Sequence, residues 1–189
     1  MLKPWRKLWR MGGLLFPILY FFQPRGFMLI FTAVFIVFFL ILEIIRFTNP
    51  EINKTVFQRL KMVLKEKEKK KLTTTTLFLI GAFISILFFP QPIAILALFY
   101  LIFGDSLAEI VGITAGKIKI FEKTLEGSAA CLLVCIIIGV IFHYTMGIGL
   151  LAVVLGAIAA TITELIPARI DDNLTIPLVA GLVMVLASI

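Results

Sequence analysis

Long apolar runs alternate with short polar segments along almost the entire chain. Seven runs rich in Leu, Ile, Phe, Val and Ala cover approximately 11–23, 27–45, 74–89, 92–110, 127–143, 147–165 and 174–189. A straight bilayer crossing takes roughly 20 apolar residues, so several runs are near the lower limit. Proline and glycine mark tight turns between them, as at Pro24, Pro90 and Gly147. The pattern predicts an all-α polytopic membrane helix bundle of about seven transmembrane helices, forming one domain over residues 1–189.

Composition agrees with this prediction. The chain is 61% hydrophobic and 15% charged, whereas soluble domains average roughly 45–50% apolar and about 25% charged residues. Cys131 and Cys135 lie inside an apolar run, and there is no second pair of cysteines to complete a metal site. We therefore expect a membrane protein in which both cysteines act as small packing residues.

The basic residues set the predicted orientation. With the N-terminus inside and seven crossings, every Lys and Arg except Arg25 falls on the inner side, as the positive-inside rule expects of a cytoplasmic face. This predicts a multi-pass cell-membrane protein with a cytoplasmic N-terminus and a basic cytoplasmic loop over 46–73. Within that loop, Lys61 to Lys71 fits either an amphipathic helix on anionic headgroups or a solvated segment. The net charge of +7 belongs to this rim and does not predict a nucleic-acid partner, because no binding motif accompanies it.

Acidic residues gather at the predicted inner ends of the last four runs. They are Asp105, Glu109, Glu122, Glu126, Glu164, Asp171 and Asp172. Ionisable groups in or beside hydrocarbon are costly, so they mark a functional site by default. Asp105 and Glu109 are four residues apart on one helical face, which Gly112 and Gly116 continue. Glycine there permits close approach by another helix or by a ligand.

Carboxylates beside lysines and glycines suit phosphoryl transfer. Mg²⁺ on one or two carboxylates offsets the charge of a triphosphate, and a carboxylate can take the proton of an attacking hydroxyl. The chain has no P-loop and no dinucleotide fingerprint, and His143, its single histidine, is predicted at the outer end of the fifth span, far from Ser106 and Ser128. The residues alone thus leave three functions open: nucleotide-dependent lipid chemistry, transport and a structural role. The acids gather at one face of the membrane, whereas transporter sites usually lie near the bilayer midplane. This position favours an enzyme.

The segment 104–128 carries a more specific motif. FGDSLAEIVGITAGKIKI, followed by EKTLEGSAA, resembles the integral-membrane lipid-alcohol kinases that use CTP, which include dolichol, phytol and farnesol kinases and CTP-using diacylglycerol kinases. The matching motif residues are Gly104, Asp105, Ala108, Gly112, Gly116, Lys123, Thr124, Gly127 and Ser128. The similarity continues in EIIR, residues 43–46, and in TELIPARIDDNLTIPL, residues 163–178. In the N-terminal RKLWR, Arg10 stands where the family has His, so no role is transferred to it.

The resemblance implies transfer of a phosphate from CTP to the hydroxyl of a lipid alcohol, with the active site on the cytoplasmic face. Weighed with the chemistry above, it assigns catalysis to Asp105, Glu109 and Lys123, and an Mg²⁺ site to Asp105, Glu109 and Asp172. Expected nucleotide contacts are Lys117, Lys123, Gly127, Ser128, Asp172, Asn173 and Arg46. Two of these have simpler alternatives, because Asn173 is also suited to cap the last helix and Arg46 to pair with Glu43.

The expected partners are CTP and a membrane lipid alcohol of the isoprenoid type, such as dolichol, phytol, farnesol or geranylgeraniol. The alternatives are a diacylglycerol kinase, a CTP:phospholipid cytidylyltransferase and a small-molecule or ion transporter. The sequence leaves homo-oligomerisation open.

Overall fold

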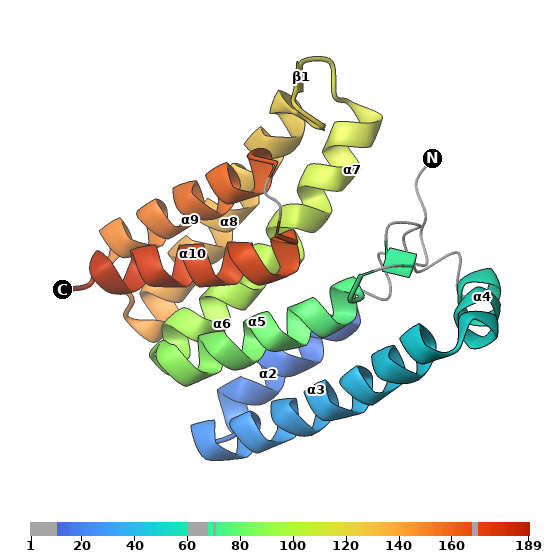
Figure 1. Ribbon diagram of the computed structural model, residues 1–189. Helices are drawn as coiled ribbons and strands as arrows, with labels where there is room; N and C mark the ends of the chain where they lie inside the picture. The colour runs from blue at the N-terminus through green and yellow to red at the C-terminus, as the bar shows by residue number, and fades with distance from the viewer. Residues whose placement is uncertain (1–10, 60–67, 70, 168–169) are drawn as a thin grey trace.

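A computed structural model describes residues 11–59, 68–69, 71–167 and 170–189, which are almost entirely helical (Figure 1). The elements follow in the order η1 (Gly12–Leu14), α2 (Leu15–Phe22), α3 (Arg25–Thr48), α4 (Pro50–Arg59), α5 (Thr74–Phe88), α6 (Gln91–Phe99), η3 (Tyr100–Asp105), α7 (Ser106–Thr114), β1 (Lys119–Ile120), β2 (Lys123–Thr124), α8 (Leu125–Met146), α9 (Leu150–Leu165) and α10 (Asp172–Leu186). Every predicted apolar run falls on helix, so the all-α prediction is confirmed for the described residues.

Three helical stretches of the described chain are long and apolar enough to cross a membrane. They are Arg25–Thr48, the continuous helix Gln91–Thr114 formed by α6, η3 and α7, and Leu125–Met146. The other apolar helices, Gly12–Phe22, Thr74–Phe88, Leu150–Leu165 and Asp172–Leu186, are shorter. Membrane association follows from the length and composition of the three long helices.

Local sequence explains where several helices begin and end. The hydroxyl of Thr73 accepts a hydrogen bond from the backbone N–H of Thr76 and caps α5. Thr124 caps α8 in the same way through Gly127, and Asp171 caps α10 through Asn173. α8 ends at Gly147, whose φ of 70° lies in the left-handed region that glycine adopts without strain.

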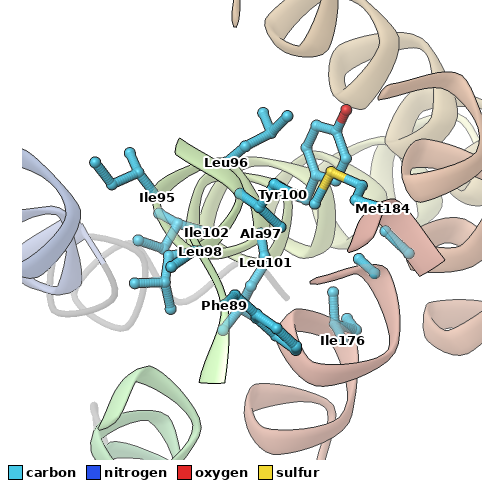
Figure 2. Close-up of a cluster of buried hydrophobic side chains, with 14 of the residues drawn as sticks. Phe89, Ile95, Leu96, Ala97, Leu98, Tyr100, Leu101, Ile102, Ile176 and Met184 are labelled. Carbon is cyan, nitrogen blue, oxygen red and sulfur yellow. The ribbon is translucent and has the colours of Figure 1, made fainter. Parts of the chain in front are cut away.

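The core is built around α6. Its residues from Ile93 to Leu98 are all buried, because α2, α5, α8 and α10 pack around it. Figure 2 shows side chains of α6 and η3 gathered with Ile176 and Met184 of α10. In contrast, α3 packs on α2 and α5 and exposes a long apolar face that includes Ile30, Val34 and Phe38. A peripheral helix with an exposed apolar face is the arrangement expected where the neighbour is lipid.

Small residues allow the helices to approach closely. A Cβ on Gly81 of α5 would lie 2.8 Å from the backbone oxygen of Asn173 in α10, and Gly156 of α9 likewise faces Met184 of α10. Lipid tails provide no hydrophobic driving force between membrane helices, so such contacts depend on close van der Waals packing. They bring the start of α10 against α5 and the end of α10 against α9.

The basic segment 46–73 contains a helix, α4, that we expected to be part of a loop. The segment Lys61 to Lys71 was predicted as either an amphipathic helix on the membrane surface or a solvated segment. Most of it lies outside the described residues. The end of the segment is fixed to α3 by Arg46, which donates to the backbone oxygens of Glu68 and Lys71, each at 2.8 Å, and is paired with Glu43. Glu43 also accepts from the backbone N–H of Thr73 at 2.8 Å. The predicted Glu43–Arg46 ion pair is therefore confirmed.

Replacing Arg46 with methionine is expected to destabilise the protein by about 3–5 kcal/mol, because it leaves the buried Glu43 carboxylate without its cation. The thermal midpoint in detergent measures this loss, and Arg59→Met, which removes an exposed arginine of α4, provides the control. Equal midpoints for the two variants would contradict a stabilising role for the ion pair.

Candidate functional site

A pocket of about 450 Å³ opens where one end of each of four helices meets. Its walls come from the end of the helix Gln91–Thr114, from β2 and the start of α8, from the end of α9 and from the start of α10. In Figure 1 these segments converge beside the β hairpin. The lining residues are Asp105, Ala108, Glu109, Gly112, Ile113, Glu122, Lys123, Thr124, Gly127, Glu164, Leu165, Ile166, Pro167, Ile170, Asp171, Asp172 and Asn173.

Most of the predicted site residues line this pocket. Asp105 is buried and Glu109 lies one turn further along the helix, and both face the pocket as their spacing predicted. Lys123, Gly127, Asp172 and Asn173 line it from other elements. Segments separated by more than 40 residues in the sequence thus supply one site.

Lys123 is held between two carboxylates. Its Nζ lies 2.9 Å from Oε1 of Glu164 and 2.9 Å from Oδ2 of Asp172, and it also donates to the backbone oxygen of Glu164. Ser128 donates to the other carboxylate oxygen, Oε2 of Glu164, at 3.1 Å. The lysine thereby joins the β hairpin to α9 and α10, and Ser128 orients the glutamate that binds it.

The electrostatics keep Lys123 charged. Burial acts to lower the pKa of Lys123, but the hydrogen bonds and charges of Asp172 and Glu164 outweigh burial and raise this pKa above its ordinary value. A lysine whose pKa is raised in the folded state stabilises the fold fully at any pH below the ordinary lysine pKa. This contribution is lost as the pH rises through the raised pKa. Lys123 therefore keeps its positive charge at neutral pH.

Asp172 is the first residue of α10 and precedes its apolar part. Burial raises the pKa of Asp172, Lys123 opposes this rise, and the charges of Asp105 and Asp171 add to it. The net direction is upward. Asp105 and Asp172 are thus near enough for their negative charges to repel one another.

The pocket is strongly acidic. Among the described residues its titratable lining consists of one cation, Lys123, and six acids: Asp105, Glu109, Glu122, Glu164, Asp171 and Asp172. Within the described chain, no three His, Cys, Asp or Glu side chains are arranged so that they could hold a metal ion, so Asp105, Glu109 and Asp172 line one pocket without forming the predicted Mg²⁺ site. Mg²⁺ usually takes only one or two carboxylates and completes its shell with water and phosphate oxygens. The pocket therefore offers oxygen donors of the kind that Mg²⁺ takes, without a complete set of ligands.

The motif glycines pack against protein. A Cβ on Gly112 or Gly116 would lie 2.9 Å from Oγ1 of Thr124, and one on Gly127 would lie 2.6 Å from the backbone oxygen of Ala108. Glycine here was expected to permit close approach either by another helix or by a ligand. The structure shows close approach by another segment of the protein. These glycines let α7 and the residues after it pack closely against Thr124, the cap of α8.

Three predicted nucleotide contacts do not line the pocket. Arg46 is bound to Glu43 and to the end of the basic segment, Lys117 is exposed on the approach to the hairpin, and Ser128 is turned toward Glu164. Asn173 lines the pocket but does not cap α10, since Asp171 does.

Glu164 was recognised in the sequence only as one of the acids, without a role as a partner of Lys123. Its signal was present in TELIPARIDDN, where Glu164 closes one apolar run just before Asp171 and Asp172 open the next. Thr124, which the motif contains, caps α8. The short hairpin β1–β2, which pairs Lys119 with Thr124, was not predicted, because two residues per strand leave no alternation to detect.

Comparison with known proteins yields two relatives. The chain is 28% identical over 180 residues to an uncharacterized protein of Rickettsia prowazekii (strain Madrid E), covering 92% of this chain and 88% of the relative. It is 35% identical over 124 residues to an uncharacterized protein of Methanocaldococcus jannaschii, covering 63% of this chain and 61% of the relative. No protein-family profile matches the chain, and no solved structure matches it.

Proposed function

We propose that this protein is an integral-membrane kinase that transfers the γ-phosphate of CTP to the hydroxyl of a lipid alcohol, most simply an isoprenoid alcohol. The observation that carries the proposal is the pocket itself, in which carboxylates and Lys123 lie at one end of a bundle of apolar helices. A water-soluble triphosphate and a lipid hydroxyl meet only at such a boundary.

The depth of the pocket supports a membrane-held acceptor. Asp105 precedes the end of its helix by nine residues, which at 1.5 Å per residue places it about 14 Å below that end. The pocket also has apolar lining from Ile113, Ile166 and Ile170, each about half exposed. A lipid whose hydroxyl approaches Asp105 would keep its tail against these side chains.

The residues divide between the two substrates. Asp105 is the general base or an Mg²⁺ ligand, with Glu109 and Asp172 as further oxygen donors to the ion. Lys123 leaves one of its carboxylates to contact a phosphate, as lysines do in other phosphotransferases. Bound Mg²⁺ would neutralise the triphosphate charge that six carboxylates otherwise repel.

The topology belongs to the proposal. We take all seven apolar helices as crossings, the four short ones tilting little or thinning the bilayer. The N-terminus and the pocket then lie on the cytoplasmic side, where CTP is found, and the basic segment 46–73 lies on the same side.

Purified protein in detergent, given γ-labelled CTP and Mg²⁺, tests the proposal. The acceptor panel contains farnesol, geranylgeraniol, phytol, dolichol, undecaprenol and diacylglycerol. Transfer of the label to an isoprenoid alcohol is the expected result, and transfer to diacylglycerol would keep the kinase but change its acceptor. Release of pyrophosphate without label transfer would replace the kinase by a cytidylyltransferase. No turnover with CTP or ATP would favour a transporter.

A further inference from the structure

The helix that carries Asp105 changes its geometry just before this residue. Tyr100–Asp105 is a π-helix, η3, between the α-helical α6 and α7. A π-turn accommodates about one more residue than an α-turn, so it changes the direction of every later side chain by about 100°. If the same residues formed an uninterrupted α-helix, Asp105 and Glu109 would not face the pocket they now line.

Contacts from neighbouring helices hold the first residue of this π-helix in place. The Tyr100 hydroxyl donates to the backbone oxygen of Val153 in α9 at 3.0 Å. The Cys135 thiol of α8 lies 3.8 Å from the backbone oxygen of Tyr100 and donates to it. A thiol is a weak donor, but this one is fully buried. A carbonyl in a widened turn therefore has an additional partner from another helix.

Gly104 makes this contact sterically feasible. A Cβ at this position would lie 2.9 Å from the sulfur of Cys135 and 2.9 Å from that of Cys131, so only glycine lets α8 come this close without displacement. Cys131 is equally buried and would meet a Cβ on Gly104 at the same distance. Its sulfur accepts from Thr161, whereas among the described residues it is Cys135 whose thiol donates to a carbonyl of η3. The two cysteines thus provide an internal comparison.

We propose that Cys135 is a positioning residue, which holds the π-helix Tyr100–Asp105 through the Tyr100 carbonyl and so directs Asp105 into the pocket. The expected effect on kcat rests on the proposed function, whereas the expected effect on the π-helix does not. Cys135 touches neither substrate, and its effect on the reaction passes through the direction of Asp105.

Cys135→Ala and Cys131→Ala, compared in the full-length protein, test this assignment. In Cys135→Ala we expect faster amide hydrogen exchange over residues 100–106 and a kcat lowered by about tenfold, because small misplacements of a reacting group are costly. The KM for CTP should stay unchanged, since Lys123 is not affected. Cys131→Ala should leave exchange and kcat near their wild-type values, and Cys135→Ser, which keeps a donor, should recover most of the lost rate.

Equal amide exchange over residues 100–106 in the two alanine variants would overturn the proposal. A serine variant as slow as the alanine variant would also overturn it, because the effect would then belong to side-chain volume. If the wild-type protein transfers no phosphate to any lipid, the proposed function fails, whereas the exchange comparison still decides whether Cys135 holds the π-helix.

Discussion

Replacing Asp105 with asparagine is expected to lower kcat for phosphate transfer about a thousandfold, within the range that general acid–base groups contribute. Asparagine matches aspartate in shape but neither accepts a proton nor carries the charge that holds Mg²⁺. Asp105 is buried and lines the pocket on the same face as Glu109. Label transfer to the best acceptor of the panel measures the effect, with CTP and Mg²⁺ saturating.

The same experiment needs evidence that the variant folds. Its elution in detergent and its thermal midpoint should match the wild type, since removing one of two repelling carboxylates does not weaken packing. Glu51→Gln makes the same chemical change on an exposed residue of α4 and should keep full activity. An Asp105→Asn protein with at least a third of wild-type kcat would remove Asp105 from the catalytic residues.

Lys123→Ala is expected to reduce kcat/KM for CTP about a hundredfold, because a cation directed at the phosphates is lost from a low-dielectric site. It should also destabilise the fold by about 2 kcal/mol, since the buried Glu164 loses its cation and a donor to its backbone oxygen. Enzyme kinetics and thermal unfolding of one variant therefore report two roles of one side chain.

Lys119→Ala is the matched control. Lys119 lies in the same hairpin, across from Thr124, but its side chain is exposed, so neither quantity should change. If Lys123→Ala lost stability while keeping kcat/KM, the lysine would be a structural partner of Glu164 and Asp172 without a role in phosphate binding.

Several features were accessible from the sequence because they depend on local composition. The apolar runs predicted the positions of the helices, because the side chains within each run decide whether that segment is buried or faces lipid. The spacing of Asp105 and Glu109 placed them on one face, and Thr124 before Leu125 was recognisable as a cap. The ion pair of Glu43 and Arg46 followed from their separation by three residues.

Other features depend on contacts that spacing cannot reveal. Ser128 belongs to the same motif as Lys123, yet it faces Glu164, which only the packing of α8 on α9 could decide. Arg46 was considered for phosphate binding because its charge is local, whereas its partners, the backbone oxygens of Glu68 and Lys71, come from a segment more than 20 residues away. The hairpin and the π-helix were also missed, since neither has a distinctive residue pattern.

The sequence by itself determined that this chain is a bundle of apolar helices with carboxylates, Lys123 and glycines concentrated near one end, because hydropathy and charge are properties of the residues. The tertiary structure decided which of those residues share a pocket. That selection arises from the way α7, α8, α9 and α10 meet and from the extra residue in the turn before Asp105, since a side chain's direction depends on the helix that carries it and on the neighbours that hold that helix.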